Sequence, residues 1–320
     1  MSDPIADLSY RGYSGGKSAT SSRWLVIAKM GWRAAFKKKS FWVFSAISAW
    51  YYFVMIAFLY VLEQLGIAQR APQFSAQLFG KMVWKDQFLT GFTYAQLFWL
   101  SLVLMVGAGA IANDNGTNAL LVYLSKPCRK IDYLVGKWMG VFVPLWVGMG
   151  VPTMFFYLYG LMNFREYGFV SQDPSLGFRL LLLTLGAAGF QSSVMIGVSS
   201  LFDKGRMAGA AYSAAFFLLS FFSNLMFVAW RVSLGGGRHG ASPALAETAQ
   251  KLYYCSLDGL QIGWAKIVLG TDGSQPFGGG GKAPEIQAPP VVLVVAPMVV
   301  ISLLGIGLAW KRIRAVEVVK

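Results

Sequence analysis

Six long apolar segments dominate the 320-residue sequence, and each is long enough to cross a lipid bilayer. They lie near residues 41–62, 88–112, 138–162, 176–202, 207–230 and 289–310. A helix of about 20 apolar residues covers the roughly 30 Å of a bilayer's hydrocarbon core. Because backbone groups in lipid must bond within their own segment, such spans form helices. The sequence therefore predicts an all-α, polytopic membrane protein with six transmembrane helices.

The composition excludes several other classes of protein. Hydrophobic residues make up 56% of the chain and charged residues only 13%, whereas a soluble domain carries about 25% charged residues. A disordered chain, a secreted disulfide scaffold and an ordinary cytosolic enzyme are excluded on these grounds.

The net charge of +14 reflects how the chain is oriented in the membrane and does not indicate nucleic acid binding. With the N-terminus inside, the segments on that side carry 18 basic and 6 acidic residues, a net charge of +12. The outer segments carry 10 basic and 8 acidic residues, a net charge of +2. Since basic residues accumulate on the cytoplasmic side, we expect a multi-pass protein of the cell membrane with both termini in the cytoplasm. In a two-membrane bacterium this is the inner membrane.

The segments that flank the six spans differ in character. Residues 1–21 are small and polar and predict a flexible cytoplasmic tail, and residues 315–320 form a short cytoplasmic C-terminus. Residues 22–40 instead predict an amphipathic helix that lies in the membrane interface. Its apolar face comprises Trp24, Leu25, Ala28, Trp32, Ala35 and Phe36, and its basic face comprises Arg23, Lys29, Arg33 and Lys37.

The longest polar segment, residues 231–288, is predicted to be extracytoplasmic. Glycine-rich stretches lie at both of its ends, and residues 243–254 and 257–269 have helical character with apolar side chains. The sequence leaves two alternatives open for these two helices. They dip into the outer leaflet, or they lie on the surface.

The sequence contains no pattern typical of catalysis, metal binding or a bound cofactor. There is one histidine, His239, and the two cysteines, Cys128 and Cys255, are predicted on opposite sides of the bilayer. A cluster with metal-ligand spacing is therefore missing. Gly16-Lys17-Ser18 matches the end of a phosphate-binding loop, but position 11, where that motif needs its first glycine, is Arg11. We predict that this chain is not an enzyme.

The most informative segment, residues 107–140, joins the second and third spans on the predicted cytoplasmic side. Small residues are followed by Asp114, by Gly116 and Thr117, and by an apolar stretch that includes Leu120 and Leu121. Pro127, Arg129, Gly136 and Lys137 then lead into the third span. A short helix that ends at the proline is expected, and its leucines need a partner surface because so short a loop cannot bury them.

This segment resembles the cytoplasmic loop of type-2 ABC transporter permeases, the membrane subunits of ATP-driven exporters. In that family an acidic residue precedes Gly-Thr, a leucine-rich coupling helix follows, and a proline, a basic residue and Gly-Lys complete the pattern. The matching residues are Asp114, Gly116, Thr117, Leu120, Leu121, Pro127, Arg129, Gly136 and Lys137. The family usually has more charge before Gly-Thr, whereas Asn113 and Asn115 flank a single acidic residue here.

The resemblance implies partners and a mechanism. A separate cytoplasmic ABC ATPase would bind ATP and Mg²⁺ and push on the coupling helix, residues 113–127. A second permease copy, most simply the same chain, would complete the assembly in the lipid bilayer. In relatives the substrate path lies between the two permeases, and spans one, two and five contribute to it. Candidate path residues in the fifth span are Phe216, Phe217, Phe221 and Phe222.

Two other functions stay open at the level of sequence. One is a membrane anchor that uses the same fold to hold a partner complex without transport. The other is an ion-coupled secondary transporter, although the span interiors carry amides and hydroxyls where such transporters usually carry ionisable groups. No residue identifies the transported substrate.

Overall fold

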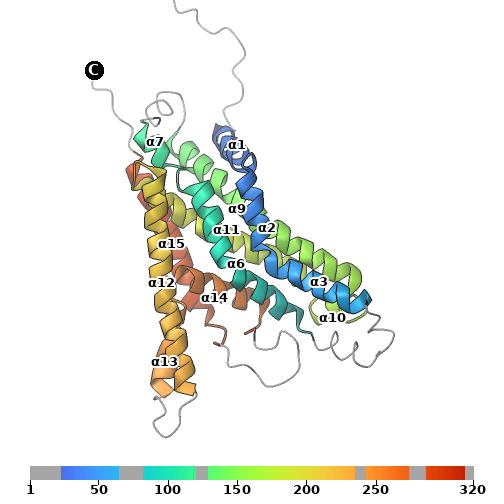
Figure 1. Ribbon diagram of the computed structural model, residues 1–320. Coiled ribbons are helices and arrows are strands. Elements are labelled where there is room, and N and C mark those ends of the chain that lie inside the picture. The colour runs from blue at the N-terminus through green and yellow to red at the C-terminus, as the bar shows by residue number, and fades with distance from the viewer. Residues whose placement is uncertain are drawn as a thin grey trace, which may run out of the picture.

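The computed structural model describes residues 23–64, 82–117, 119, 129–234, 243–273 and 286–313. Within these residues every regular element is a helix (Figure 1). Five helices are long and apolar enough to cross a membrane, and a bent helix pair makes a sixth candidate. The predicted fold class is confirmed. Leu120, Leu121, Pro127 and the predicted terminal segments 1–21 and 315–320 lie outside the described residues.

The helices follow the predicted spans closely. The first three are α1 (Arg23–Phe36), α2 (Lys39–Ser48) and α3 (Trp50–Gln64). The next are α6 (Trp84–Gly107), α7 (Ala112–Gly116), α9 (Lys130–Asn163) and α10 (Phe169–Gln172). The last are α11 (Leu176–Ser200), α12 (Gly205–Leu234), α13 (Pro243–Tyr253), α14 (Leu257–Leu269) and α15 (Val291–Arg312).

Two of the spans differ in shape from the uniform helices that the sequence predicts. The first span is divided between α2 and α3, which meet at an angle of 55°. The third span belongs to α9, which begins at Lys130, eight residues before the predicted start of the span. Since a helix rises 1.5 Å per residue, α9 extends about 12 Å beyond the predicted span start.

Helix α11 forms the centre of the bundle, and α12 lies at its periphery. Helix α11 packs against α9, α15, α14 and α6. In its most apolar stretch of 18 residues, 61% is buried inside the chain. The corresponding fraction is 17% for both α12 and α15. Helix α12 therefore presents most of its surface to lipid or to a partner.

Helix α1 packs against the first half of α9. Gly31 and Gly140 lie at the crossing, where a Cβ on Gly31 would meet the backbone of Gly140 at 2.9 Å. The indole N–H of Trp32 donates to the carbonyl of Met139 at 2.8 Å. Ala28 and Ala35 of the predicted apolar face are buried, while Lys29 on the basic face is exposed. The amphipathic pattern is present, and the position of the helix in a membrane interface stays a prediction.

One end of the bundle, the upper end in Figure 1, holds α1, α7, the start of α9, the turn between α11 and α12 and the end of α15. The Lys130 ammonium lies 4.7 Å from the ring centre of Trp310, which brings the start of α9 to the end of α15. Helix α7 packs against the turn between α11 and α12. We call this the α7 end.

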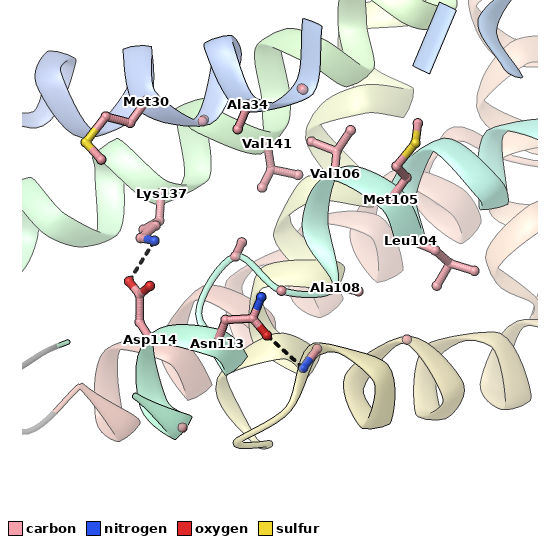
Figure 2. Close-up of a pocket in the computed structure, with 18 of the residues that line it drawn as sticks. Met30, Ala34, Leu104, Met105, Val106, Ala108, Asn113, Asp114, Lys137 and Val141 are labelled. Atoms are coloured by element: carbon pink, nitrogen blue, oxygen red, sulfur yellow. Dashed lines mark hydrogen bonds and ion pairs between the residues drawn. The ribbon is translucent and has the colours of Figure 1, made fainter. Parts of the chain in front are cut away.

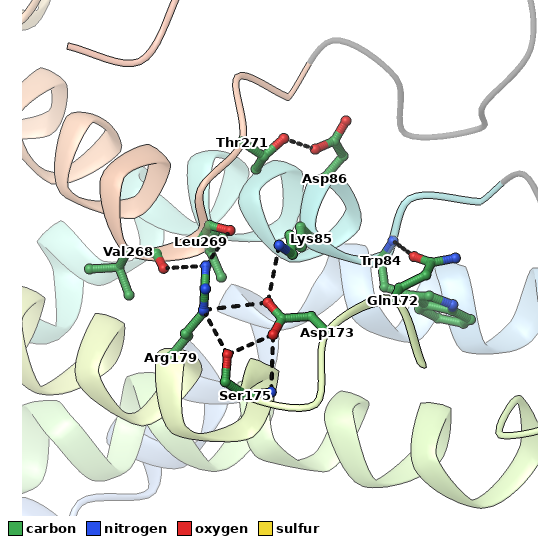
Figure 3. A network of polar contacts seen from close by, with 10 residues as sticks. All are labelled: Trp84, Lys85, Asp86, Gln172, Asp173, Ser175, Arg179, Val268, Leu269 and Thr271. Atoms are coloured by element: carbon green, nitrogen blue, oxygen red, sulfur yellow. Dashed lines mark hydrogen bonds and ion pairs between the residues drawn. The ribbon is translucent and has the colours of Figure 1, made fainter. Parts of the chain in front are cut away.

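A polar cluster ties three helices together at the opposite end of the bundle (Figure 3). Asp173, only 7% exposed, lies 3.1 Å from the Lys85 ammonium and 3.4 Å from Nε of Arg179, and its other oxygen accepts from Ser175. Arg179 also donates to the carbonyl of Leu269 at 3.1 Å, at the end of α14. We call Lys85, Asp173, Ser175 and Arg179 the Asp173 cluster. It joins the starts of α6 and α11 to the end of α14.

The two helices of the outer segment run back along the spans. Helix α13 returns beside α12, because the hydroxyl of Ser223 donates to the carbonyl of Tyr253 at 2.5 Å. Helix α14 then lies among α6, α11, α12 and α15, and most of its side chains are buried. The indole N–H of Trp264 donates to the carbonyl of Leu183, two turns into α11. Helix α14 therefore lies within the bundle, and its depth in a membrane stays a prediction.

Candidate functional site

The candidate site begins where α6 ends, in a run of small residues. Helix α6 stops at Gly107, and a turn separates it from α7. Ser199 of α11 holds this turn, since its hydroxyl oxygen accepts from the backbone N–H groups of Ile111 and Ala112 at 3.1 and 3.0 Å. The same hydroxyl donates to the carbonyl of Ala108 at 2.9 Å. A buried side chain therefore satisfies backbone groups that the broken helix leaves unpaired.

The two asparagines of α7 bind the turn between α11 and α12. The side-chain oxygen of Asn113 accepts from the backbone N–H of Gly205 at 3.1 Å. The side-chain nitrogen of Asn115 donates to the carbonyl of Phe202 at 3.1 Å and to that of Ser200 at 3.3 Å. A Cβ at Gly116 would overlap the backbone oxygen of Asp203. Glycine at this position is what lets α7 approach the turn so closely.

Asp114 connects α7 to α9. Its carboxylate lies 2.7 Å from the ammonium of Lys137 and accepts from the hydroxyl of Tyr133 at 2.7 Å (Figure 2). Asp114 and Lys137 are 17% and 18% exposed, so solvent screens their ion pair less than a surface pair. We call Asp114, Tyr133 and Lys137 the Asp114 cluster. Helix α7 is thus fastened to α9 on one side and to α11 and α12 on the other.

A cavity of about 1170 Å³ lies beside the Asp114 cluster. Helices α1, α6, α7, α9 and α12 contribute to its walls (Figure 2). The charged lining residues are Lys38, Asp114, Lys137, Asp203, Lys204 and Arg206. The ammonium of Lys38 donates to the carbonyl of Met105 at 3.2 Å, near the end of α6. The cavity therefore separates α1 from the start of α12 at the α7 end.

The structure brings together some of the predicted coupling residues. Asp114 and Lys137 are paired directly, Gly116 packs on the α11–α12 turn, and the hydroxyl of Thr117 donates to the carbonyl of Asn113 at 2.8 Å. Arg129 precedes α9, and its backbone N–H donates to the Asp132 carboxylate at 3.2 Å. Their role in coupling stays a prediction.

The four predicted path residues of α12 divide into two groups. Phe216 is buried inside the chain, only 4% exposed. The other three are among its exposed large side chains: Phe217, Phe221 and Phe222.

Sequence reasoning missed the residues that hold α7 in place. Ser199 is one of two adjacent serines near the end of an apolar span, and Tyr133 follows Asp132 just before another, so nothing in the local composition singles out either residue. Tyr133 precedes Lys137 by four residues, one helical turn, so both face the same neighbour. That spacing is the one signal that points to Tyr133.

Among the described residues, no group of three or more histidine, cysteine, aspartate or glutamate side chains is placed to hold a metal ion.

Several helices long and apolar enough to span a bilayer define a polytopic helical membrane protein. The family model for "ABC-2 family transporter protein" matches residues 25–308, and the chain belongs to this family. The resemblance drawn from residues 107–140 is confirmed. Membrane subunits of the family typically lack an ATPase domain. No curated protein and no solved structure matches the chain.

Proposed function

We propose that the chain is the permease subunit of an exporter that is driven by a separate ATPase, which binds ATP and Mg²⁺. The observation that carries this proposal is the double attachment of α7. Asp114 joins α7 to α9, while Asn113 and Asn115 join it to the turn between α11 and α12. A force applied at this loop therefore reaches three spans through short polar contacts.

The cavity beside the Asp114 cluster supports this mechanism, because it leaves room for movement. Helices α1 and α12 line it from different sides, and small residues such as Gly31, Gly109 and Gly209 form much of its wall. When the ATPases close, α7 moves with α9, and α12 tilts relative to α1. In this proposal residues 113–127, whose first part belongs to α7, form the coupling segment, and Leu120 and Leu121 enter a groove on the ATPase.

The proposal fixes the orientation of the chain and adds a second copy. The α7 end faces the cytoplasm, together with both termini, since the basic residues collect there. Helix α12 is largely exposed in the single chain and carries Phe217, Phe221 and Phe222 on its surface. A homodimer that pairs these faces would place the substrate path between the two copies.

The test is assembly with a candidate ABC ATPase from the same organism. The complex is purified in lipid nanodiscs, and ATP hydrolysis is measured with and without the permease. We expect stable assembly and a hydrolysis rate raised severalfold by the permease. Substituting Leu120→Asp and Leu121→Asp should abolish both effects. Met162→Asp, at an 82% exposed position near the opposite end of α9, is the matched control and should change neither.

Other outcomes would favour the two alternatives. Stable assembly without any change in hydrolysis would indicate a membrane anchor. Transport that continues without ATPase and stops when a proton or sodium gradient is removed would indicate a secondary transporter. Unchanged assembly and hydrolysis in the double leucine variant would refute the coupling-segment assignment.

A further inference from the structure

Helices α13 and α14 carry an acidic side chain deep into the spans. The chain leaves α12 at the outer end, returns along it through α13, and turns into α14 at Ser256. Asp258, in the first turn of α14, accepts from the hydroxyl of Ser220 of α12 at 2.8 Å. The depth of this carboxylate follows from the position of its partner, Ser220, along α12.

Ser220 lies fifteen residues after Gly205, the first residue of α12. At 1.5 Å per residue this is about 22 Å along the helix. With the apolar stretch of α12 beginning after Arg206, Ser220 lies about 20 Å from the edge of the hydrocarbon core at the α7 end. The whole core is about 30 Å thick. On the other side of α14, Trp264 contacts α11 at Gly186 and Leu183, seven to ten residues from the outer end of that helix. Both neighbours place Asp258 well below the outer surface.

Asp258 lies in the first turn of a helix, and no ion pair to it is present among the described residues. The Ser256 hydroxyl oxygen caps α14 by accepting from the N–H of Gly259 at 2.9 Å, so the carboxylate lies at the positive end of a helix. Asp258 is partly exposed. An ionised group facing lipid at this depth costs several kilocalories per mole. Such groups almost always face water, protein or a substrate.

The face of α12 beside Asp258 is itself unsuited to lipid. Phe217, Ser220, Phe221 and Asn224 follow the helical spacing i, i+3, i+4, i+7 and share one face. Asn224 is exposed, although its side-chain nitrogen bonds the carbonyl of Ser220 at 2.8 Å. Phe217 and Phe221 are 53% and 63% exposed. An exposed amide and a partly exposed carboxylate on one side of the bundle both indicate a water-accessible surface.

We propose that Asp258, Ser220 and Asn224, flanked by Phe217 and Phe221, bind the positively charged group of a hydrophobic organic cation on the transport path. The carboxylate supplies the countercharge, and the aromatic faces attract a cation and cover its apolar part. This inference rests on the proposed function, because it requires α12 to line the path. It adds a substrate class to that function.

Cys255, three residues before Asp258, is an exposed reporter for the site. In a Cys128→Ser chain it is the single thiol. The assembled transporter in nanodiscs is treated with two methanethiosulfonate reagents of similar size, a cationic trimethylammonium and an anionic sulfonate. Each rate of reaction with Cys255 is divided by the rate of the same reagent with a free thiol. We expect this relative rate to be about tenfold higher for the cationic reagent than for the anionic one. Asp258→Asn should remove that preference, whereas Asp258→Glu should keep it.

Asp272→Asn is the matched control, because it removes the same charge beyond the other end of α14. That site is about 20 Å away by helical rise, and the charge preference at Cys255 should persist. The proposal is overturned if Cys255 reacts with neither reagent, or with both at equal relative rates. It is also overturned if Asp272→Asn lowers the charge preference as much as Asp258→Asn does.

Ligand binding is tested with two ions of matched shape. Tetraphenylphosphonium should slow the reaction of Cys255 with neutral N-ethylmaleimide, and tetraphenylborate, its anionic counterpart, should not. We expect Asp258→Asn to raise the half-protecting concentration of the cation about tenfold. Equal protection by both ions, or no protection by either, would contradict a cation site.

The two proposals fail in different ways. If hydrolysis still responds to the permease but Cys255 shows no charge preference, the cation site is wrong and the permease assignment stands. If assembly with the ATPase fails while the cation protects Cys255, the site stands and the exporter assignment is wrong.

Discussion

The Asp173 cluster and the Asp114 cluster lie at opposite ends of the bundle, and each is built around a single aspartate. Asp173 is surrounded by Lys85, Arg179 and Ser175. Asp114 has Lys137 and Tyr133, and it borders a cavity of about 1170 Å³. The first cluster holds helices together at the end opposite α7, whereas the second lies beside the cavity.

This difference assigns the two ends different roles. Burial raises the pKa of Asp173, but hydrogen bonds from Ser175 and Lys85 and the charge of Lys85 outweigh it and hold the pKa below its ordinary value. The ionised carboxylate is therefore part of the folded structure. We infer that the outer end is a fixed joint and that motion, when α7 is pushed, occurs at the other end.

We expect the largest effect, a loss of folding stability, from Asp173→Ala. This change leaves Lys85 and Arg179 without their countercharge and frees the start of α11. We expect the free energy of unfolding to fall by about 3 kcal/mol, measured by tryptophan fluorescence in detergent. Glu247→Gln, in an exposed pair with Lys251, is the control and should produce no resolvable change. If Asp114→Ala costs as much as Asp173→Ala, the proposed distinction between the two ends is wrong.

The next effect concerns the contact between α7 and the α11–α12 turn. Gly116→Val forces a side chain against the backbone of Asp203, so we expect a loss of about 2 kcal/mol in unfolding free energy. ATPase stimulation should fall with it. Gly307→Val is the matched control, because a Cβ there meets nothing within 4 Å. Equal losses in both variants would show that the close approach at Gly116 contributes nothing.

A smaller effect is expected for the ion pair of the Asp114 cluster. A double-mutant cycle with Asp114→Asn and Lys137→Met should give a coupling energy of about 1 kcal/mol, since the pair is partly exposed. Both single variants should reduce ATPase stimulation by more than this stability change explains. Stimulation that tracks stability alone would argue that the pair only holds the fold.

The smallest effect is a dependence of stability on pH. Because the folded pKa of Asp173 is lowered, its contribution is present above the unfolded value of about 3.9 and is lost as the pH falls through the folded value. Thermal unfolding in detergent between pH 6 and pH 3 should therefore show a loss below about pH 4. In Asp173→Asn that part of the loss should vanish. A variant that retains the whole acid response would exclude Asp173 as its source.

The spans were predictable because lipid demands long apolar helices, and the family was predictable from residues 107–140. The roles of α11 and α12 were not. Both spans are apolar to a similar degree, yet 61% of the most apolar stretch of α11 is buried and only 17% of that of α12. Lipid tails and a protein interior are equally apolar, so hydrophobicity does not tell which face contacts protein.

The sequence by itself determined where the long apolar helices lie and that basic residues collect at one end, because these depend on local composition and on the bilayer. Only the tertiary structure decided that Asp114 meets Lys137, 23 residues further along the chain. It also brought Asp258 of an outer segment to Ser220 in the middle of α12. Such pairings depend on how helices return and cross, and long-range packing fixes them.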